Sequence, residues 1–181
     1  SRGLGDVYKR QRLTDEEVIA RCPWATTGRT HHRTPNIITS LELDPAEMEK
    51  RNIHLQKKYA EIEENEVRFE ELHCEDAEYL IVAFGSCARI AQKAMEMARE
   101  EGIKVGLLRP ITLWPFPSKA IAARAAQVKG ILTVELNAGQ MVEDVRLAVE
   151  CKVPVEHFGR LGGIVPDPDE VITALKEKLI K

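Results

Sequence analysis

The sequence predicts an α/β domain with an open, mostly parallel sheet that is covered by helices on both faces. Residues 79–84 form an unbroken apolar run, as expected of a strand buried on both sides, and the run ends at Gly85 and Ser86. An alanine-rich stretch with a helical period follows and closes at Gly102. The same strand and helix unit then recurs to the end of the chain, which is the pattern of a parallel sheet.

The repeating unit gives four predicted strands and four predicted helices. Apolar runs predict strands at 79–84, 104–108, 130–135 and 153–158. Amphipathic runs between them predict helices at 87–101, 118–128 and 140–150. A last helix starts at Asp167, Pro168, Asp169 and Glu170, where acidic residues and a proline suit a helix N-terminus. We expect right-handed crossovers between the parallel strands.

The chain before residue 77 has a different organisation. Residues 1–43 form an irregular N-terminal arm, of which residues 1–10 are interpreted as a cloning or assembly scar. The arm contains one short helix, 14–21, with Thr14 and Glu17 as a capping box. Residues 44–76 form a connector helix and a short strand, 67–72, and residues 77–181 form the α/β domain.

The connector helix is well signalled at its start and carries one narrow apolar stripe. Asp44 is the expected N-cap, Pro45 takes the first helical position, and the helix should end near residue 64. The stripe consists of Met48, Leu55, Tyr59 and Ile62. An intramolecular connector is the favoured interpretation, and a partner-binding coiled coil is the alternative.

Composition excludes several classes of protein. The 181 residues include 26 Lys and Arg against 29 Asp and Glu, a net charge of -3, which argues against a nucleic-acid-binding protein. No apolar stretch approaches the roughly 18 residues that span a bilayer, and no secretory signal opens the chain, so a cytoplasmic location without membrane contact is expected. The four cysteines lie far apart without a C-x-x-C pair, and the five histidines fall in no ligand motif, so no metal site is expected.

Candidate functional residues follow the strands, because open α/β sheets bind ligands beyond the carboxyl ends of their strands. Gly85 and Ser86 open a helix. The favoured interpretation is that Ser86 acts only as an N-cap, and the alternative is that the first turn of this helix binds an anion. The turn containing Glu135, Asn137 and Gln140 is either a subunit interface or part of a composite active site. Arg160 in a glycine-rich turn is the remaining candidate for anion contact.

A stiff apolar loop follows the predicted strand 104–108. Arg109 leads into Pro110, and three prolines surround Trp114 and Phe116 in the stretch up to Pro117. Apolar loops of this kind mark contact surfaces when exposed. The alternative is that Trp114 and Phe116 pack under the next helix.

Two segments carry a family resemblance. VGLLRPITLWPFP at 105–117 and VELNAGQMVEDVR at 134–146 resemble the alpha subunit of 2-oxoacid:ferredoxin oxidoreductases, most closely the 2-ketoisovalerate or branched-chain type. PWATTG at 23–28, PNII at 35–38 and IEENEV at 62–67 extend the resemblance from about residue 22 to the C-terminus. The resemblance implies that residues 77–181 are a transketolase C-terminal-like domain.

The resemblance also implies a function for the complete enzyme. Such an enzyme oxidatively decarboxylates a 2-oxoacid to an acyl-CoA with thiamine diphosphate, Mg, iron-sulfur clusters and CoA, and passes electrons to ferredoxin. This chain lacks the thiamine-type G-D-G pattern, since Gly5-Asp6 is followed by Val7, so the isolated fragment is expected to bind none of these cofactors and to be inactive. Its expected partners are a thiamine pyrophosphate-binding beta subunit and a ferredoxin-like subunit, and it is expected to serve assembly and shaping of the composite site.

Two other functions stay open. One is a self-sufficient small-molecule or anion-binding domain. The first strand-to-helix turn argues against it, because this turn lacks the glycine fingerprint of dinucleotide-binding proteins. The other is the structural C-terminal domain of another thiamine enzyme, against which the run GQMVED at 139–144 favours the ferredoxin-linked family. The exposed Trp114 loop further predicts a homodimer of the isolated chain.

Overall fold

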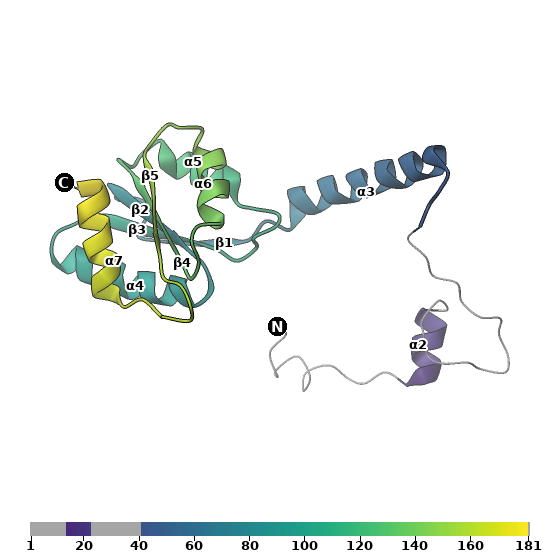
Figure 1. The fold of residues 1–181 in the computed structure, drawn as a ribbon, viewed down its shortest axis with the longest axis horizontal. Coiled ribbons are helices and arrows are strands. Elements are labelled where there is room, and N and C mark those ends of the chain that lie inside the picture. The colour runs from purple at the N-terminus through teal and green to yellow at the C-terminus, as the bar shows by residue number, and fades with distance from the viewer. Residues whose placement is uncertain (1–13, 23–40, 181) are drawn as a thin grey trace. The chain divides into compact units, whose positions relative to one another are not determined.

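The computed structural model describes residues 14–22 and 41–180 (Figure 1). The chain divides into two compact units, residues 1–52 and 53–181. In the first unit, helix α2 (Asp15–Arg21) starts at the predicted capping box. The Glu17 carboxylate accepts the backbone N–H of Thr14 at 2.8 Å, and the Thr14 hydroxyl accepts that of Glu17 at 3.3 Å.

Helix α3 (Pro45–Asn65) has nearly the bounds that its sequence predicts. The Asp44 carboxylate accepts the backbone N–H of Ala46 at 2.8 Å, which satisfies one of the free donors of the first turn. No residue of α3 is buried, so its apolar stripe does not contribute to a hydrophobic core.

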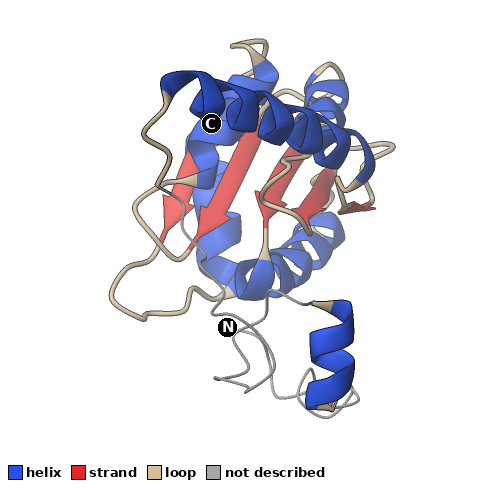
Figure 2. Cartoon of the chain, turned by 90° about the vertical axis from the view of Figure 1, so that its right-hand side faces the viewer, coloured by secondary structure: helices blue, strands red, loops and turns tan. Residues whose placement is uncertain are grey.

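The second unit contains a five-stranded sheet with the order β1-β3-β2-β4-β5, which lies between two layers of helices (Figure 2). Strands β2, β3, β4 and β5 are mutually parallel, which confirms the predicted mostly parallel sheet. The strands are β1 (Phe69–Leu72), β2 (Tyr79–Ala83), β3 (Val105–Pro110), β4 (Ile131–Glu135) and β5 (Val155–Gly159).

Strand β1 is an antiparallel edge strand of this sheet, a pairing that the sequence pattern did not specify. It pairs with β3 so that Glu70 lies opposite Arg109, and their side chains form an ion pair at 2.7 Å. This pairing extends β3 to Pro110, two residues beyond the predicted end at Leu108. The connector therefore joins the sheet directly.

Helices cover both faces of the sheet (Figure 1). Helix α4 (Gly85–Glu100) and helix α7 (Pro168–Leu175), which continues into the short π-helix η1 (Lys176–Ile180), lie on one face. Helix α5 (Ser118–Ala125) and helix α6 (Met141–Val149) lie on the other. Side chains alternate along each strand, so Leu132 packs with α4 and α7, whereas Ile131 packs with α5 and α6.

The last helix begins as predicted. Asp167 is its N-cap and forms a reciprocal capping box with Glu170, and Pro168 takes the first helical position. Both buried clusters consist mainly of aliphatic residues, and the alanines on α4 let this helix lie close to the sheet.

Candidate functional site

The carboxyl edge of the sheet contains a switch point between β2 and β4. These strands are adjacent and parallel, yet β2 leads into α4 on one face and β4 leads into α6 on the other. A crevice at such a point is where open α/β sheets bind ligands. The structure brings Gly85, Ser86, Glu135, Asn137, Gln140 and Arg160 to this edge.

Glu135 is the centre of the edge, and its side chain is fully buried. Its carboxylate accepts the backbone N–H groups of Gln140, Met141 and Val142 at 3.3, 2.9 and 3.1 Å. Gln140, the N-cap residue of α6, makes no capping bond with its own side chain. The end of β4 therefore supplies the cap of α6, and a negative charge lies at the positive end of that helix.

The turn after Glu135 is held from within by Asn137. The Asn137 amide donates to the Glu135 carboxylate at 3.1 Å, and its side-chain oxygen accepts the N–H of Gly139 at 2.7 Å. Gly139 has φ 112°, which favours glycine. With these groups occupied, the turn exposes Leu136, which is 46% exposed, together with Gln140.

His157 on β5 completes the cluster, although it belongs to no metal-ligand or catalytic motif. Its Nδ1 lies 3.2 Å from the Thr133 hydroxyl and 3.5 Å from the Glu135 carboxylate. Its Nε2 lies 3.3 Å from the carbonyl oxygen of Asn137, which accepts a hydrogen bond from the ring when Nε2 is protonated. The imidazole thus holds the turn against β5.

Gly159 makes this packing possible. A Cβ atom at residue 159 would lie 2.2 Å from the Asn137 carbonyl oxygen and 2.6 Å from His157 Nε2. Residue 159 also pairs with Glu135 in the sheet. A sequence signal for the cluster does exist, because polar residues alternate along one face of both strands, Thr133 and Glu135 on β4 beside His157 on β5.

The prediction that Ser86 is an N-cap is wrong. Helix α4 begins at Gly85, the N-cap is Phe84, and no side chain caps this end. Gly85 has a φ of 57°, which residues with a side chain rarely adopt. Glycine at this position therefore lets the helix begin one residue before Ser86. Ser86 lies exposed in the first turn, and anion binding there stays a prediction.

Arg160 leaves β5 beside Glu135, whose carbonyl oxygen accepts its backbone N–H at 3.3 Å. Its Nη1 lies 3.4 Å from the carboxylate of Glu170, a residue of the α7 capping box. Its Nε atom is buried without a hydrogen-bond partner. The guanidinium therefore links the end of β5 to the start of α7.

The Trp114 loop lies at the end of β3, and its two aromatic residues differ in exposure. Phe116 is half-buried and packs on the α5 and α6 core, as the packing alternative predicts. Trp114 is 55% exposed, and its ring meets Tyr59 edge to face with centroids 5.5 Å apart.

The backbone of this loop is pinned by internal hydrogen bonds. The Thr112 hydroxyl donates to the Pro115 carbonyl at 2.8 Å and accepts the N–H of Arg68 at 3.0 Å. Pro115 and Pro117 are buried, whereas Ile111 and Leu113 are each 47% exposed. Arg109 is not part of the edge cluster, since Glu70 on β1 engages its guanidinium.

No group of three or more His, Cys, Asp or Glu side chains suited to a metal ion occurs among residues 14–22 and 41–180. Within the same ranges, no helix combines the length and apolar character needed to cross a membrane.

Family comparison identifies the domain. Residues 77–171 match the family described as pyruvate:ferredoxin oxidoreductase core domain II. The chain belongs to this family. The matched range begins just before β2 and ends within α7, so it includes the whole edge cluster around Glu135.

Relatives of this core domain II are oxidoreductase subunits. The chain is 44% identical over 176 residues to the ketoisovalerate oxidoreductase subunit VorB of Methanothermobacter thermautotrophicus, with 96% of this chain and 49% of the relative covered. It is 33% identical over 101 residues to the 2-oxoglutarate synthase subunit KorA of Methanothermobacter marburgensis, covering 56% of this chain and 27% of the relative. The chain spans about half the length of VorB.

Solved structures share the fold. A 2-oxoglutarate:ferredoxin oxidoreductase from Magnetococcus marinus, with 2-oxoglutarate, coenzyme A and succinyl-CoA bound, matches with a TM-score of 0.68 and 25% identity, over 82% of this chain and 28% of that chain. A split-gene transketolase, an inactive beta4 tetramer, matches with a TM-score of 0.54 and 21% identity, over 62% of this chain and 41% of that chain. The latter likeness concerns the fold alone.

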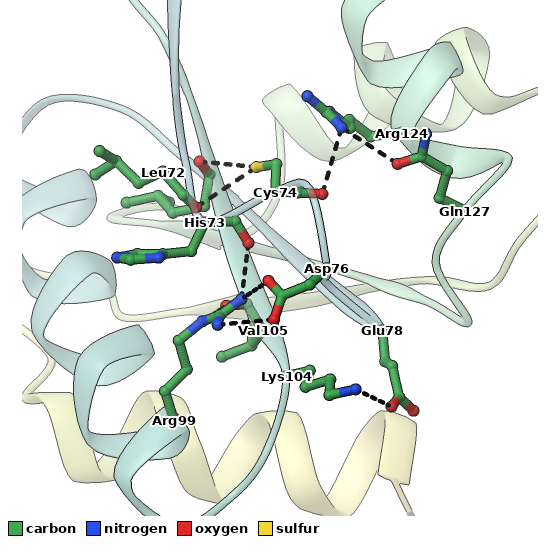
Figure 3. Close-up of polar contacts among 11 residues, drawn as sticks. Leu72, His73, Cys74, Asp76, Glu78, Arg99, Lys104, Val105, Arg124 and Gln127 are labelled. Carbon is green, nitrogen blue, oxygen red and sulfur yellow. Dashed lines mark hydrogen bonds and ion pairs between the residues drawn. The ribbon is translucent and has the colours of Figure 1, made fainter.

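In this core domain II, two arginines clamp the turn between β1 and β2 (Figure 3). Arg99 from α4 donates to the carbonyl oxygens of His73 and Val105, each at 2.8 Å, and to the two oxygens of the Asp76 carboxylate at 2.6 and 3.3 Å. Arg124 from α5 binds Glu71 with two bonds, at 2.9 and 2.6 Å. Arg124 also donates to the carbonyl oxygen of Cys74 at 3.3 Å, so the turn between β1 and β2 is tied to helices on both faces of the sheet.

The charges of these clamps perturb nearby groups. Hydrogen bonds from Arg124 lower the pKa of Glu71, and Glu71 in turn raises the pKa of Arg124. Burial raises the pKa of the Cys74 thiol to about 11. Burial, followed by the charge of Glu135, also raises the pKa of Cys87. Both thiols are therefore poor nucleophiles, in contrast to reactive cysteines.

Proposed function

We propose that this chain is part of the alpha subunit of a thiamine-diphosphate-dependent 2-oxoacid:ferredoxin oxidoreductase that converts a branched-chain 2-oxoacid to an acyl-CoA. The 44% identity to a ketoisovalerate oxidoreductase subunit supports the substrate class. The lower identity to 2-oxoglutarate synthase subunits, over a shorter part of the chain, supports ketoisovalerate over 2-oxoglutarate.

Within that enzyme, the proposed role of core domain II is assembly and the shaping of a composite site. The observation that carries this role is the turn at 136–140, whose polar groups are consumed in holding the turn while Leu136 and Gln140 face solvent. A rigid, partly apolar surface of this kind suits a protein interface, because little conformational entropy is lost on binding.

The donor groups of the described residues do not fit Mg or an iron-sulfur cluster. Cys74 and Cys87 are buried thiols with raised pKa, and the described residues offer no cluster that would hold Mg or an iron-sulfur centre. The Glu135 carboxylate is occupied by backbone N–H groups and the Asn137 amide. We therefore propose that thiamine diphosphate, Mg, the clusters and CoA are bound by other parts of the complex, including the beta and ferredoxin-like subunits.

The activity is tested on the complete enzyme, purified with all subunits, by CoA-dependent reduction of ferredoxin or a viologen dye. The expected result is a higher kcat/KM for 2-ketoisovalerate than for pyruvate or 2-oxoglutarate, with no dye reduction by the 181-residue chain alone. A preference for pyruvate or 2-oxoglutarate would overturn the substrate class, and turnover by the isolated chain would overturn its assembly role.

A further inference from the structure

The C-terminal half of α3, residues 53–65, presents two different faces. Ala60, Glu63 and Glu64 line a groove of about 1020 Å³ that they share with Trp114 and its neighbouring prolines. Leu55, Tyr59 and Ile62 fall within an arc of roughly 60° on another side, given about 100° per residue in an α-helix. The groove side therefore faces the domain, and the apolar stripe lies to one side of it.

Among the described residues, the stripe joins neither buried cluster of the domain, and Trp114 meets it at Tyr59. Leu55 and Ile62 are half-buried, Tyr59 is 38% exposed, and no residue of α3 is buried. Trp114, which meets Tyr59 edge to face, extends the apolar surface beyond the helix. Spacings of four and three residues are those of the d, a and d positions in a coiled-coil seam.

The flanking charges indicate what covers the stripe. Lys58 and Glu63 lie on opposite sides of the seam, at the g position of one heptad and the e position of the next. In the described part of the chain neither side chain makes an ion pair, although α3 pairs other residues, such as Lys50 with Glu47. In two parallel helices, the g residue of one faces the following e residue of the other, so two copies would form two Lys58–Glu63 pairs.

We propose that residues 53–65 form a parallel coiled-coil seam that binds a second copy of this chain, with Trp114 beside it. The chain supplies both halves of the charge pattern, as a twofold contact between identical surfaces requires. This proposal does not depend on the proposed oxidoreductase function. A seam this short gives a weak dimer, since small interfaces are typical of transient contacts.

Sedimentation equilibrium of the purified 181-residue chain at low salt tests the seam, at concentrations from about 1 to 500 µM because weak interfaces are expected. A monomer–dimer equilibrium is expected. Lys58→Glu should weaken it about tenfold by replacing two attractive pairs with repulsive ones. The double variant Lys58→Glu/Glu63→Lys should restore the wild-type dissociation constant, since the exchanged charges again attract.

Lys57→Glu is the matched control. It makes the same change in charge one residue away, on the side of the helix opposite the seam, and should leave the dimer unchanged. Leu55→Asp should abolish the dimer while the far-UV circular dichroism stays that of the wild type, because α3 has no buried residue. A monomer at every concentration, equal effects of Lys57→Glu and Lys58→Glu, or a double variant that stays weak would each overturn the proposal.

Discussion

The Glu135 carboxylate accepts the backbone N–H of Met141 at 2.9 Å, so the last residue of β4 caps the helix that follows it. The five residues between them form the exposed turn of the carboxyl edge. This arrangement makes one buried charge responsible both for the stability of α6 and for the shape of the surface that Leu136 and Gln140 present. Its consequences are measurable.

Removing the Glu135 carboxylate should destabilise the domain. Glu135→Ala leaves the first backbone donors of α6 buried and unsatisfied, and a loss of about 3 kcal/mol in the free energy of unfolding is expected. Glu135→Gln keeps one acceptor oxygen and should lose less. Urea denaturation measures both, and a Glu135→Ala variant as stable as the wild type would show that the cap contributes nothing.

Gly159→Ala should disrupt the same edge from β5. The added Cβ would meet the Asn137 carbonyl oxygen at 2.2 Å, which is backbone and cannot move without shifting the turn, so a cost of about 2 to 4 kcal/mol is expected. Gly130→Ala is the control, because its added Cβ would meet only the flexible end of Leu179 at 2.8 Å. Equal unfolding free energies for the two variants would contradict the close packing.

The Glu71–Arg124 pair should make stability depend on pH at the acidic end. Because Arg124 lowers the pKa of Glu71 from its ordinary value of 4.5, the unfolded chain binds this proton more readily than the folded one. The stabilisation is therefore present above about pH 4.5 and is lost as the pH falls through the lower folded pKa. Glu71→Gln should cost about 2 kcal/mol at pH 7, and the cost should shrink at pH 3.

Denaturant unfolding at the two pH values measures this difference. A cost for Glu71→Gln that is the same at pH 3 and pH 7 would show that the charge of Glu71 is not the source of its stabilisation.

The thiols of Cys151, Cys74 and Cys87 should react at different rates. Cys151 is exposed and should be labelled by Ellman's reagent at pH 8, whereas Cys74 and Cys87 are buried with raised pKa and should react only after unfolding in guanidinium. Peptide mass mapping assigns the labelled sites. Rapid labelling of Cys74 in the folded chain would contradict the buried position of this side chain in the β1–β2 turn.

Regular periodicity is what made much of the fold predictable. The apolar run before Gly85 and the proline after Asp167 located β2 and α7 within a residue or two, because burial and capping act locally. The pairing of β1 was not predictable in this way, since it depends on contacts between Glu70 and Arg109, 39 residues apart. The start of α4 was misplaced because Gly85 adopts a positive φ that no local pattern demanded.

The position of the candidate polar turn could be predicted from the sequence, but the roles of its side chains could not. The density of polar groups from Glu135 to Gln140 pointed to the carboxyl edge of the sheet, but the sequence could not show that Glu135 points inward and that its carboxylate caps α6. His157 was missed because a lone histidine at a strand end has no motif, and the alternating polar residues Thr133 and Glu135 point to it only once the register of β5 beside β4 is known. Trp114 and Phe116 lie two positions apart in the same loop, yet the ring of Trp114 is exposed and that of Phe116 is packed against the core.

The most direct test of the assembly role is the affinity of the purified chain for the thiamine pyrophosphate-binding partner subunit, measured by isothermal titration calorimetry. Saturable binding is expected, and Leu136→Asp should weaken it at least tenfold. Leu147→Asp, the same change at a more exposed leucine on α6 away from the turn, should leave it unchanged. Absence of binding by the chain, while the full-length alpha subunit binds, would contradict the assembly role.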